Sequence, residues 1–188
     1  LSMGLYSYRE DKKSKVNVTF LIICISICFW SIGYAFMLIS PNIEIANIWR
    51  IIALFGSCFF DGLMISFVLA IKNVEDKKFS LKTHFWVYIP AIIFFLYNLS
   101  YAPSKIISNK AYGFVSDLYF TTNGGTIFSI YLTLVLIAVF VIEYMVMKNS
   151  KKNRVRKQMR IIMITGMISF FIGSITDFIC PLLGDRKS

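Results

Sequence analysis

Ionisable residues are scarce in this 188-residue sequence. Charged side chains make up 16% of the chain, against about 25% in an average soluble protein. The one histidine, His84, stands at the edge of an apolar run, where an interfacial position is a better explanation than a catalytic role. HExxH, GxSxG and P-loop motifs are all absent. The sequence therefore contains no catalytic constellation, and we predict no enzyme activity for it.

The four cysteines form neither a disulfide pattern nor a metal pattern. Cys24, Cys28 and Cys58 fall inside long apolar runs, where a thiol behaves as a small apolar side chain. Cys24 and Cys28 lie one helical turn apart, but a soft-metal site would need a second pair of ligands. We therefore expect no metal site and no cofactor.

Hydrophobic residues are abundant, at 57% of the chain against about 45–50% in soluble proteins. They form runs that could cross a hydrocarbon core about 30 Å thick, which takes roughly 20 residues. We predict five spans, at residues 17–39, 48–71, 85–101, 126–147 and 161–183. A lone span satisfies its backbone hydrogen bonds internally, and the runs lack the alternation of barrel strands. The predicted fold is an all-α polytopic transmembrane helix bundle, with residues 1–188 in a single domain.

The basic residues predict how the spans are oriented. Of the 20 Lys and Arg residues, 15 lie in three segments, residues 9–15, 72–84 and 148–160. Lys and Arg are enriched in cytoplasmic loops, so we predict that these segments are cytoplasmic in a multi-pass cell-membrane protein. Residues 40–47, residues 102–125 and the C-terminal tail are then outside. This pattern also explains the net charge of +10, and no nucleic-acid partner is predicted.

The two ends of the segment indicate further helices. Residues 1–8 look like the last turns of an apolar helix whose beginning is missing. That helix would be a sixth span, and a cytoplasmic domain after Ser188 would require a seventh. We therefore expect five full spans of a seven-helix module.

Four charged residues fall within the predicted spans. Charge at mid-bilayer costs at least about 2.5–3.5 kcal/mol, so such side chains usually face the bundle interior. Arg50 and Asp177 are expected to approach one another near the outer side, either as an ion pair that fixes packing or in a polar pocket that binds a ligand. Asp61 lies near mid-span with no obvious basic partner, which suits a helix contact or ligand sensing. Glu143 is expected to snorkel towards Lys148 or Arg160.

The longest outward segment, residues 102–125, mixes aromatic and polar side chains. Aromatic rings beside polar groups suit a small-molecule or peptide site, although a loop lying on the membrane surface has the same composition. Together with the charged residues of the spans, this segment supplies the candidate ligand-binding residues: Arg50, Asp61, Asp177, Tyr112, Phe114 and Asp117.

Glycines recur within the predicted spans and permit close helix approach. They are Gly33, Gly56, Gly62, Gly166 and Gly173.

Short motifs follow one another in a familiar order. They are FWSIGYA at residues 29–35, Trp49-Arg50, Tyr88-Ile89-Pro90 and RKQMR at residues 156–160. This order resembles the N-terminal seven-transmembrane sensor region of bacterial histidine kinases and diguanylate cyclases, over nearly the whole chain. In that family one span precedes this segment and one follows it, in agreement with the count from the charges.

The resemblance implies a membrane-embedded input module that regulates a cytoplasmic output domain, such as a histidine kinase, on the same chain. Its partners would be membrane lipids and a small-molecule or peptide signal, and a homodimer is a further option. The alternative is a small solute transporter or permease fragment. A transporter should show broken helices or an internal repeat, and only Pro90 interrupts a span. A membrane-bound enzyme would need clustered histidines or acids at one interface, which the sequence lacks.

Overall fold

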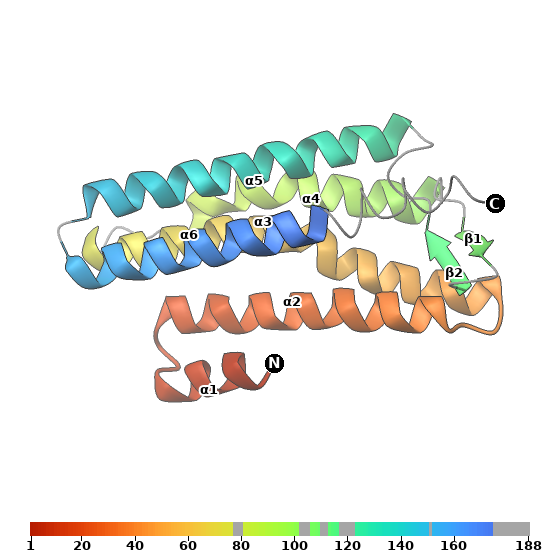
Figure 1. Ribbon diagram of the computed structural model, residues 1–188, viewed down its shortest axis with the longest axis horizontal. Helices are drawn as coiled ribbons and strands as arrows, with labels where there is room; N and C mark the ends of the chain where they lie inside the picture. The colour runs from red at the N-terminus through yellow and green to blue at the C-terminus, as the bar shows by residue number, and fades with distance from the viewer. Residues whose placement is uncertain (77–80, 102–105, 110–112, 117–122, 151, 175–188) are drawn as a thin grey trace. The chain divides into compact units, whose positions relative to one another are not determined.

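The computed structural model describes residues 1–76, 81–101, 106–109, 113–116, 123–150 and 152–174. Within them the chain forms six helices and one two-stranded hairpin (Figure 1). The elements are α1 (Ser2–Glu10), α2 (Lys15–Leu38), α3 (Ile43–Asp76), α4 (Leu81–Tyr101), β1 (Ile106–Asn109), β2 (Gly113–Ser116), α5 (Asn123–Asn149) and α6 (Asn153–Ser174). The predicted helical fold is confirmed, and the hairpin is an addition to it. The chain divides into two compact units, Leu1–Val139 and Phe140–Ser188.

Two helical segments are long and apolar enough to cross a membrane. They are Lys15–Leu38, which is the whole of α2, and the Ile43–Lys72 part of α3. A shorter apolar stretch, Val87–Leu99, lies within α4. These assignments consider only the described residues and rest on length and composition. The spans predicted at 85–101, 126–147 and 161–183 remain predictions.

Side-chain caps set the starts of α2 and α3. The Ser14 hydroxyl accepts a hydrogen bond from the Asn17 N–H at 3.4 Å, and the Asn42 side-chain oxygen accepts one from the Ile45 N–H at 2.9 Å. Both are N-cap interactions, which satisfy donors that the first turn of a helix leaves unpaired. Because Asn42 starts α3 at Ile43, the turn between α2 and α3 is shorter than the predicted residues 40–47.

Helices α2 and α3 pack with their backbones in close contact. A Cβ atom on Gly56 would lie 2.5 Å from the Ser26 carbonyl oxygen and 2.5 Å from the Trp30 nitrogen. A Cβ atom on Gly33 would lie 2.5 Å from the Ala53 nitrogen. The Ser26 hydroxyl also donates to the Gly56 carbonyl oxygen at 2.6 Å. These two glycines therefore serve the close helix approach that the sequence predicted.

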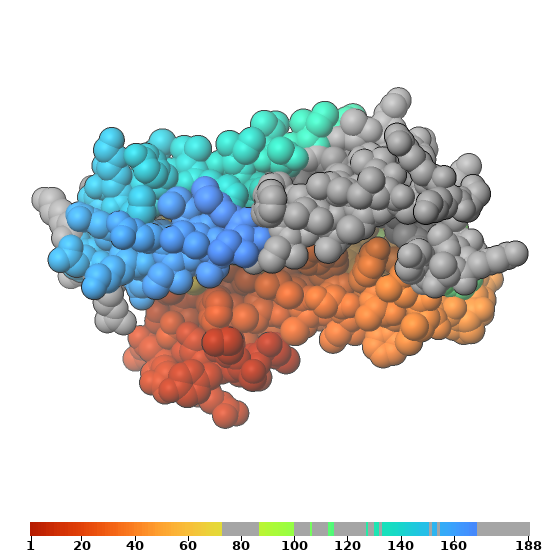
Figure 2. Space-filling view, viewed as in Figure 1, coloured from red at the N-terminus to blue at the C-terminus, as the bar shows by residue number. Residues whose placement is uncertain are grey.

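Helices α1 and α4 also pack on this helix pair at glycine residues. A Cβ atom on Gly4 would lie 2.9 Å from the Cys24 Cβ, so α1 packs directly on α2 (Figure 2). A Cβ atom on Gly62 would lie 2.9 Å from the Tyr88 ring, so α4 packs on α3. The Tyr88 hydroxyl is hydrogen-bonded to the Ser66 hydroxyl at 2.8 Å.

The hairpin pairs Ile106 with Ser116 and Asn109 with Gly113 in antiparallel register. Gly113 has φ +81°, a conformation that glycine adopts without strain, and its α-carbon approaches the Leu38 carbonyl group at the end of α2. The hairpin contacts both α2 and α3. We call this part of the first unit, residues 38–50 with strands β1 and β2, the hairpin end (Figure 1).

The second unit contains the end of α5 and helix α6. A Cβ atom on Gly166 would make an ordinary contact with the Phe140 ring at 3.5 Å. Helix α6 begins at Asn153, eight residues before the predicted span at 161. Its first turns are rich in Arg, Lys, Gln and Met, which are strong helix formers, so the helix extends beyond its apolar part. Gly173 lies in α6, but its surroundings fall outside the described side chains.

Candidate functional site

Arg50 is the most deeply buried cation among the described residues, with 3% of its surface exposed. It lies two turns into α3. Its Nε donates a hydrogen bond to the Asn47 side-chain oxygen at 2.9 Å. Its Nη1 has no hydrogen-bond partner among the described residues. A guanidinium carries five donors in a planar fork that matches carboxylate and phosphate groups. Arg50 can therefore hold an anionic group through the donor that remains.

The hairpin lies at the same end of the first unit as Arg50. Strands β1 and β2 both contact α3, and Gly113 lies against the last residue of α2. The candidate Phe114 is half-buried in β2, where it pairs with Ser108. Arg50 and Phe114 thus lie at the same end of the first unit, and their role in binding a ligand stays a prediction. The candidates Tyr112, Asp117 and Asp177 lie outside the described residues, so the pairing of Arg50 with Asp177 remains a prediction.

Asp61 lies in a different place from Arg50. It follows Arg50 by eleven residues along α3, which is about 16 Å at 1.5 Å per residue. The side chain is 8% exposed and lies close enough to the Cys58 thiol and the Tyr131 hydroxyl to interact with them electrostatically. Among the described side chains, no basic group pairs with it. Asp61 is therefore a separate polar position inside the helix bundle.

Aromatic packing surrounds that position. Leu54 and Cys58 form a buried core, and aromatic rings of α3, α4 and α5 pack against it. The rings of Phe94 and Tyr131 are 5.2 Å apart, centroid to centroid. The Asp61 carboxyl group therefore lies next to an apolar and aromatic core that offers it few polar neighbours.

Residues 1–183 match the family model described as the N-terminal 7TM region of histidine kinase. The chain belongs to this family. No curated protein and no solved structure matches it. The resemblance that the motifs at 29–35 and 156–160 indicated is confirmed. The histidine kinase 7TM region is the sensor module of its proteins and not their catalytic part, and it is embedded in the membrane.

This 7TM region has a second buried carboxyl group, which was expected to snorkel towards a neighbouring cation and does not. Glu143 in α5 is 1% exposed, and its Oε2 has no hydrogen-bond partner among the described residues. The expected ion pair with Lys148 or Arg160 is not found there, and both of these cations are exposed. Helix α6 begins at Asn153, so most of residues 148–160 are helical and not the loop that this expectation assumed.

Two of the residues that shape these positions in the 7TM region were not singled out from the sequence. Asn47 precedes Arg50 by three residues, a spacing that places both side chains on one face of a helix, so this contact could have been predicted. Tyr131 comes from a helix far from Asp61 in the sequence. Only the packing of α5 in the first unit brings it close, and no local pattern indicates that.

Proposed function

We propose that this 7TM region receives an external signal at the hairpin end and regulates a cytoplasmic output domain on the same chain. The observation that carries the proposal is the Arg50 guanidinium, which is buried and keeps an unused donor among the described residues. Charge-assisted hydrogen bonds to a carboxylate or phosphate are about twice as strong as neutral ones. An anionic group of the signal would bind there, or would change the pairing of Arg50 with Asp177.

Helix α3 would carry the signal from the hairpin end to the opposite end of the first unit. It runs without a break from Ile43 to Asp76 and is 34 residues, or about 51 Å, long. Close contacts at Gly33 and Gly56 fix it to α2. A displacement of α3 at Arg50 would therefore be carried along the helix pair, because packed helices shift as bodies and not residue by residue.

The test is the kinase activity of the full-length protein after Arg50→Ala and Arg50→Lys. Glu44→Ala is the matched control, because it removes an exposed charge from the same end of α3. Hydrogen bonds to charged groups are worth about 1.5–3 kcal/mol, so Arg50→Ala should change the active fraction by about tenfold or more. Membrane vesicles that contain each variant are incubated with fresh medium or with conditioned growth medium, and their autophosphorylation is compared. If all three variants insert normally into the membrane and show equal activity and equal response, Arg50 is not part of the signal site.

A further inference from the structure

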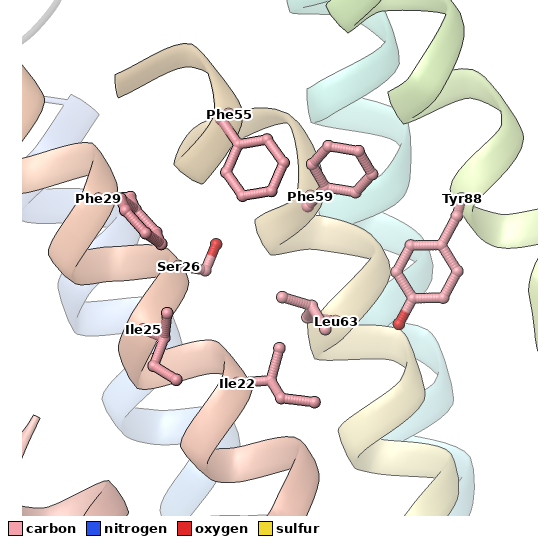
Figure 3. Close-up of a pocket in the computed structure, with 8 residues that line it drawn as sticks. All are labelled: Ile22, Ile25, Ser26, Phe29, Phe55, Phe59, Leu63 and Tyr88. Atoms are coloured by element: carbon pink, nitrogen blue, oxygen red, sulfur yellow. The ribbon is translucent and has the colours of Figure 1, made fainter. Parts of the chain in front are cut away.

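An apolar groove is lined by residues of α2, α3 and α4, and Arg50 is not among them (Figure 3). Its volume is about 190 Å³. Helix α2 contributes Ile22, Ile25 and Phe29, and α3 contributes Phe55 and Leu63, all of which point towards the groove in Figure 3. Phe29 is 43% exposed and Phe55 is 46% exposed, so the groove is open along one side.

The polar side chains at the groove are already hydrogen-bonded within the protein. The Ser26 hydroxyl donates to the Gly56 carbonyl oxygen at 2.6 Å, and the Tyr88 hydroxyl bonds to that of Ser66 at 2.8 Å. A typical small-molecule site keeps a few polar groups that orient its ligand, and this groove has none to spare. Its occupant is therefore a hydrocarbon and not a polar signal.

Helix α2 carries a cation on the same face as the groove. Lys15, Ile22 and Phe29 follow one another at seven-residue intervals, which return to the same side of a helix after two turns. Lys15 is exposed. It lies about 10 Å along the axis from Ile22 and about 21 Å from Phe29. One leaflet of hydrocarbon is about 15 Å deep, half of a core of about 30 Å. A chain anchored at Lys15 therefore reaches into the groove, towards the Phe29 ring.

Further lysines gather at this end of the helix pair. The rings of Phe20 and Phe67 are 5.9 Å apart, so the start of α2 lies beside the last turns of α3. Lys72 on α3 is exposed, as are Lys12 and Lys13 just before α2. Each lysine near an anionic membrane surface is worth about 1 kcal/mol of attraction. Glu10, Asp11, Glu75 and Asp76 lie at this end as well, so it is the exposed Lys15, on the face of the groove, that suits the headgroup of an anionic lipid.

We propose that the groove binds one acyl chain of an anionic phospholipid whose headgroup lies at Lys15. The closest contact of α2 with α3 lies at Gly56 and Gly33, and the groove opens beyond it, towards Leu63. A bound chain would wedge between α2 and α4 at that point. Lipid composition would then change the packing of α2 against α3, the helix that also carries Arg50. The lipid site would be separate from the signal site.

The test uses the full-length protein in nanodiscs of phosphatidylcholine with a small share of phosphatidylglycerol that carries a photoreactive group in its acyl chain. Crosslinked peptides are mapped by mass spectrometry. Labelling of the peptides around Phe29 and Phe55 should saturate, and unlabelled phosphatidylglycerol should compete better than phosphatidylcholine or an uncharged diacylglycerol. Ile25→Trp, which fills the groove, should lower labelling at least fivefold. Ile27→Trp should leave labelling unchanged, because Ile27 does not line the groove. It is a matched control, since Ile27 is 40% exposed and Ile25 is 37% exposed.

The headgroup is tested by Lys15→Gln, with the exposed Lys148→Gln as control. Loss of about 1 kcal/mol corresponds to about a fivefold loss of preference for phosphatidylglycerol over phosphatidylcholine. Labelling that does not saturate, or that is equal in Ile25→Trp and Ile27→Trp, means bulk lipid only and overturns the proposal. Equal competition by the uncharged diacylglycerol or by phosphatidylcholine overturns the headgroup at Lys15. If Ile25→Trp inserts poorly into the membrane, Ile22→Phe takes its place, and its labelling is compared with that of Ile27→Trp.

Discussion

Burial and charge oppose one another at Arg50. An isolated charge in a low-dielectric interior is costly, and the Asn47 side chain compensates only one of the five guanidinium donors. A residue of this kind remains in a membrane helix because something pairs with it. Two groups can do so, an acid of the chain such as Asp177 or an anionic group of the signal, and the first of these can be tested without knowing the signal.

We predict that Arg50→Ala and Asp177→Ala, made singly, each lower the free energy of unfolding by about 3–5 kcal/mol, and that the double variant loses less than the sum. Each single change leaves one buried charge without its partner, whereas the double change leaves none. Thermal unfolding of the detergent-solubilised full-length protein, followed by tryptophan fluorescence, measures this. Strictly additive losses would show that the two residues do not pair.

At the residue scale, the sequence was a good guide to which charged residues are buried. It was a poorer guide to the side chains that surround them. Arg50 and Asp61 were singled out because apolar runs flank them, and both are buried. The partner of Glu143 was predicted wrongly, because that prediction took residues 148–160 as a loop. The neighbour of Asp61, Tyr131, depends on tertiary packing, which a single sequence does not contain.

At the scale of elements, the contact of α2 with α3 depends on the absence of two side chains. A Cβ atom on Gly56 would lie 2.5 Å from backbone atoms of α2, which cannot move away as the end of a flexible side chain can. Gly166 has ordinary space, with its nearest neighbour 3.5 Å away. The two glycines therefore form a matched pair for the same substitution.

We predict that Gly56→Ala lowers the free energy of unfolding by about 1–3 kcal/mol, because the added methyl group overpacks the helix contact. Gly166→Ala should leave stability unchanged or raise it by up to about 1 kcal/mol, since alanine is the better residue inside a helix. Thermal unfolding of the two variants in the same detergent makes the comparison. Equal effects of the two substitutions would argue against close α2–α3 packing.

Hydropathy predicted where the helices lie, but not where they end. The long helices of the structure cover nearly all of the five apolar runs as far as the residues are described, yet α3 begins at Ile43 and α6 at Asn153, ahead of the spans predicted at 48–71 and 161–183. The cap residue Asn42 and the helix-forming side chains around Arg156 set those starts. The hairpin was missed because its strands are four residues each and lie in a segment interpreted as a loop. The β-branched Ile106, Ile107 and Val115 were the available signal.

At the scale of the whole molecule, the charge distribution predicts one orientation in the membrane. We predict that Lys110→Cys is labelled by an impermeant thiol reagent in intact cells, whereas Lys77→Cys and Arg154→Cys are labelled only after permeabilisation. The reason is that 15 of the 20 Lys and Arg residues lie in segments 9–15, 72–84 and 148–160. The four native cysteines are replaced first, and that background serves as the control. Labelling at position 154 in intact cells would contradict this topology.

The predicted orientation would place the hairpin end outside, and the input should then depend on residues 102–125. We predict that Tyr112→Ala, Phe114→Ala and Asp117→Ala, made in the full-length protein with its native output domain, weaken the response to conditioned growth medium. Their aromatic and acidic side chains would be the contacts that the signal makes before it reaches Arg50. Kinase activity is measured at matched insertion, with the conservative Ile106→Val in β1 as the control for the hairpin itself. A response that all three variants retain in full would exclude the loop as the input, and Arg50, Asp61 and Asp177 would be left as the residues through which the signal acts.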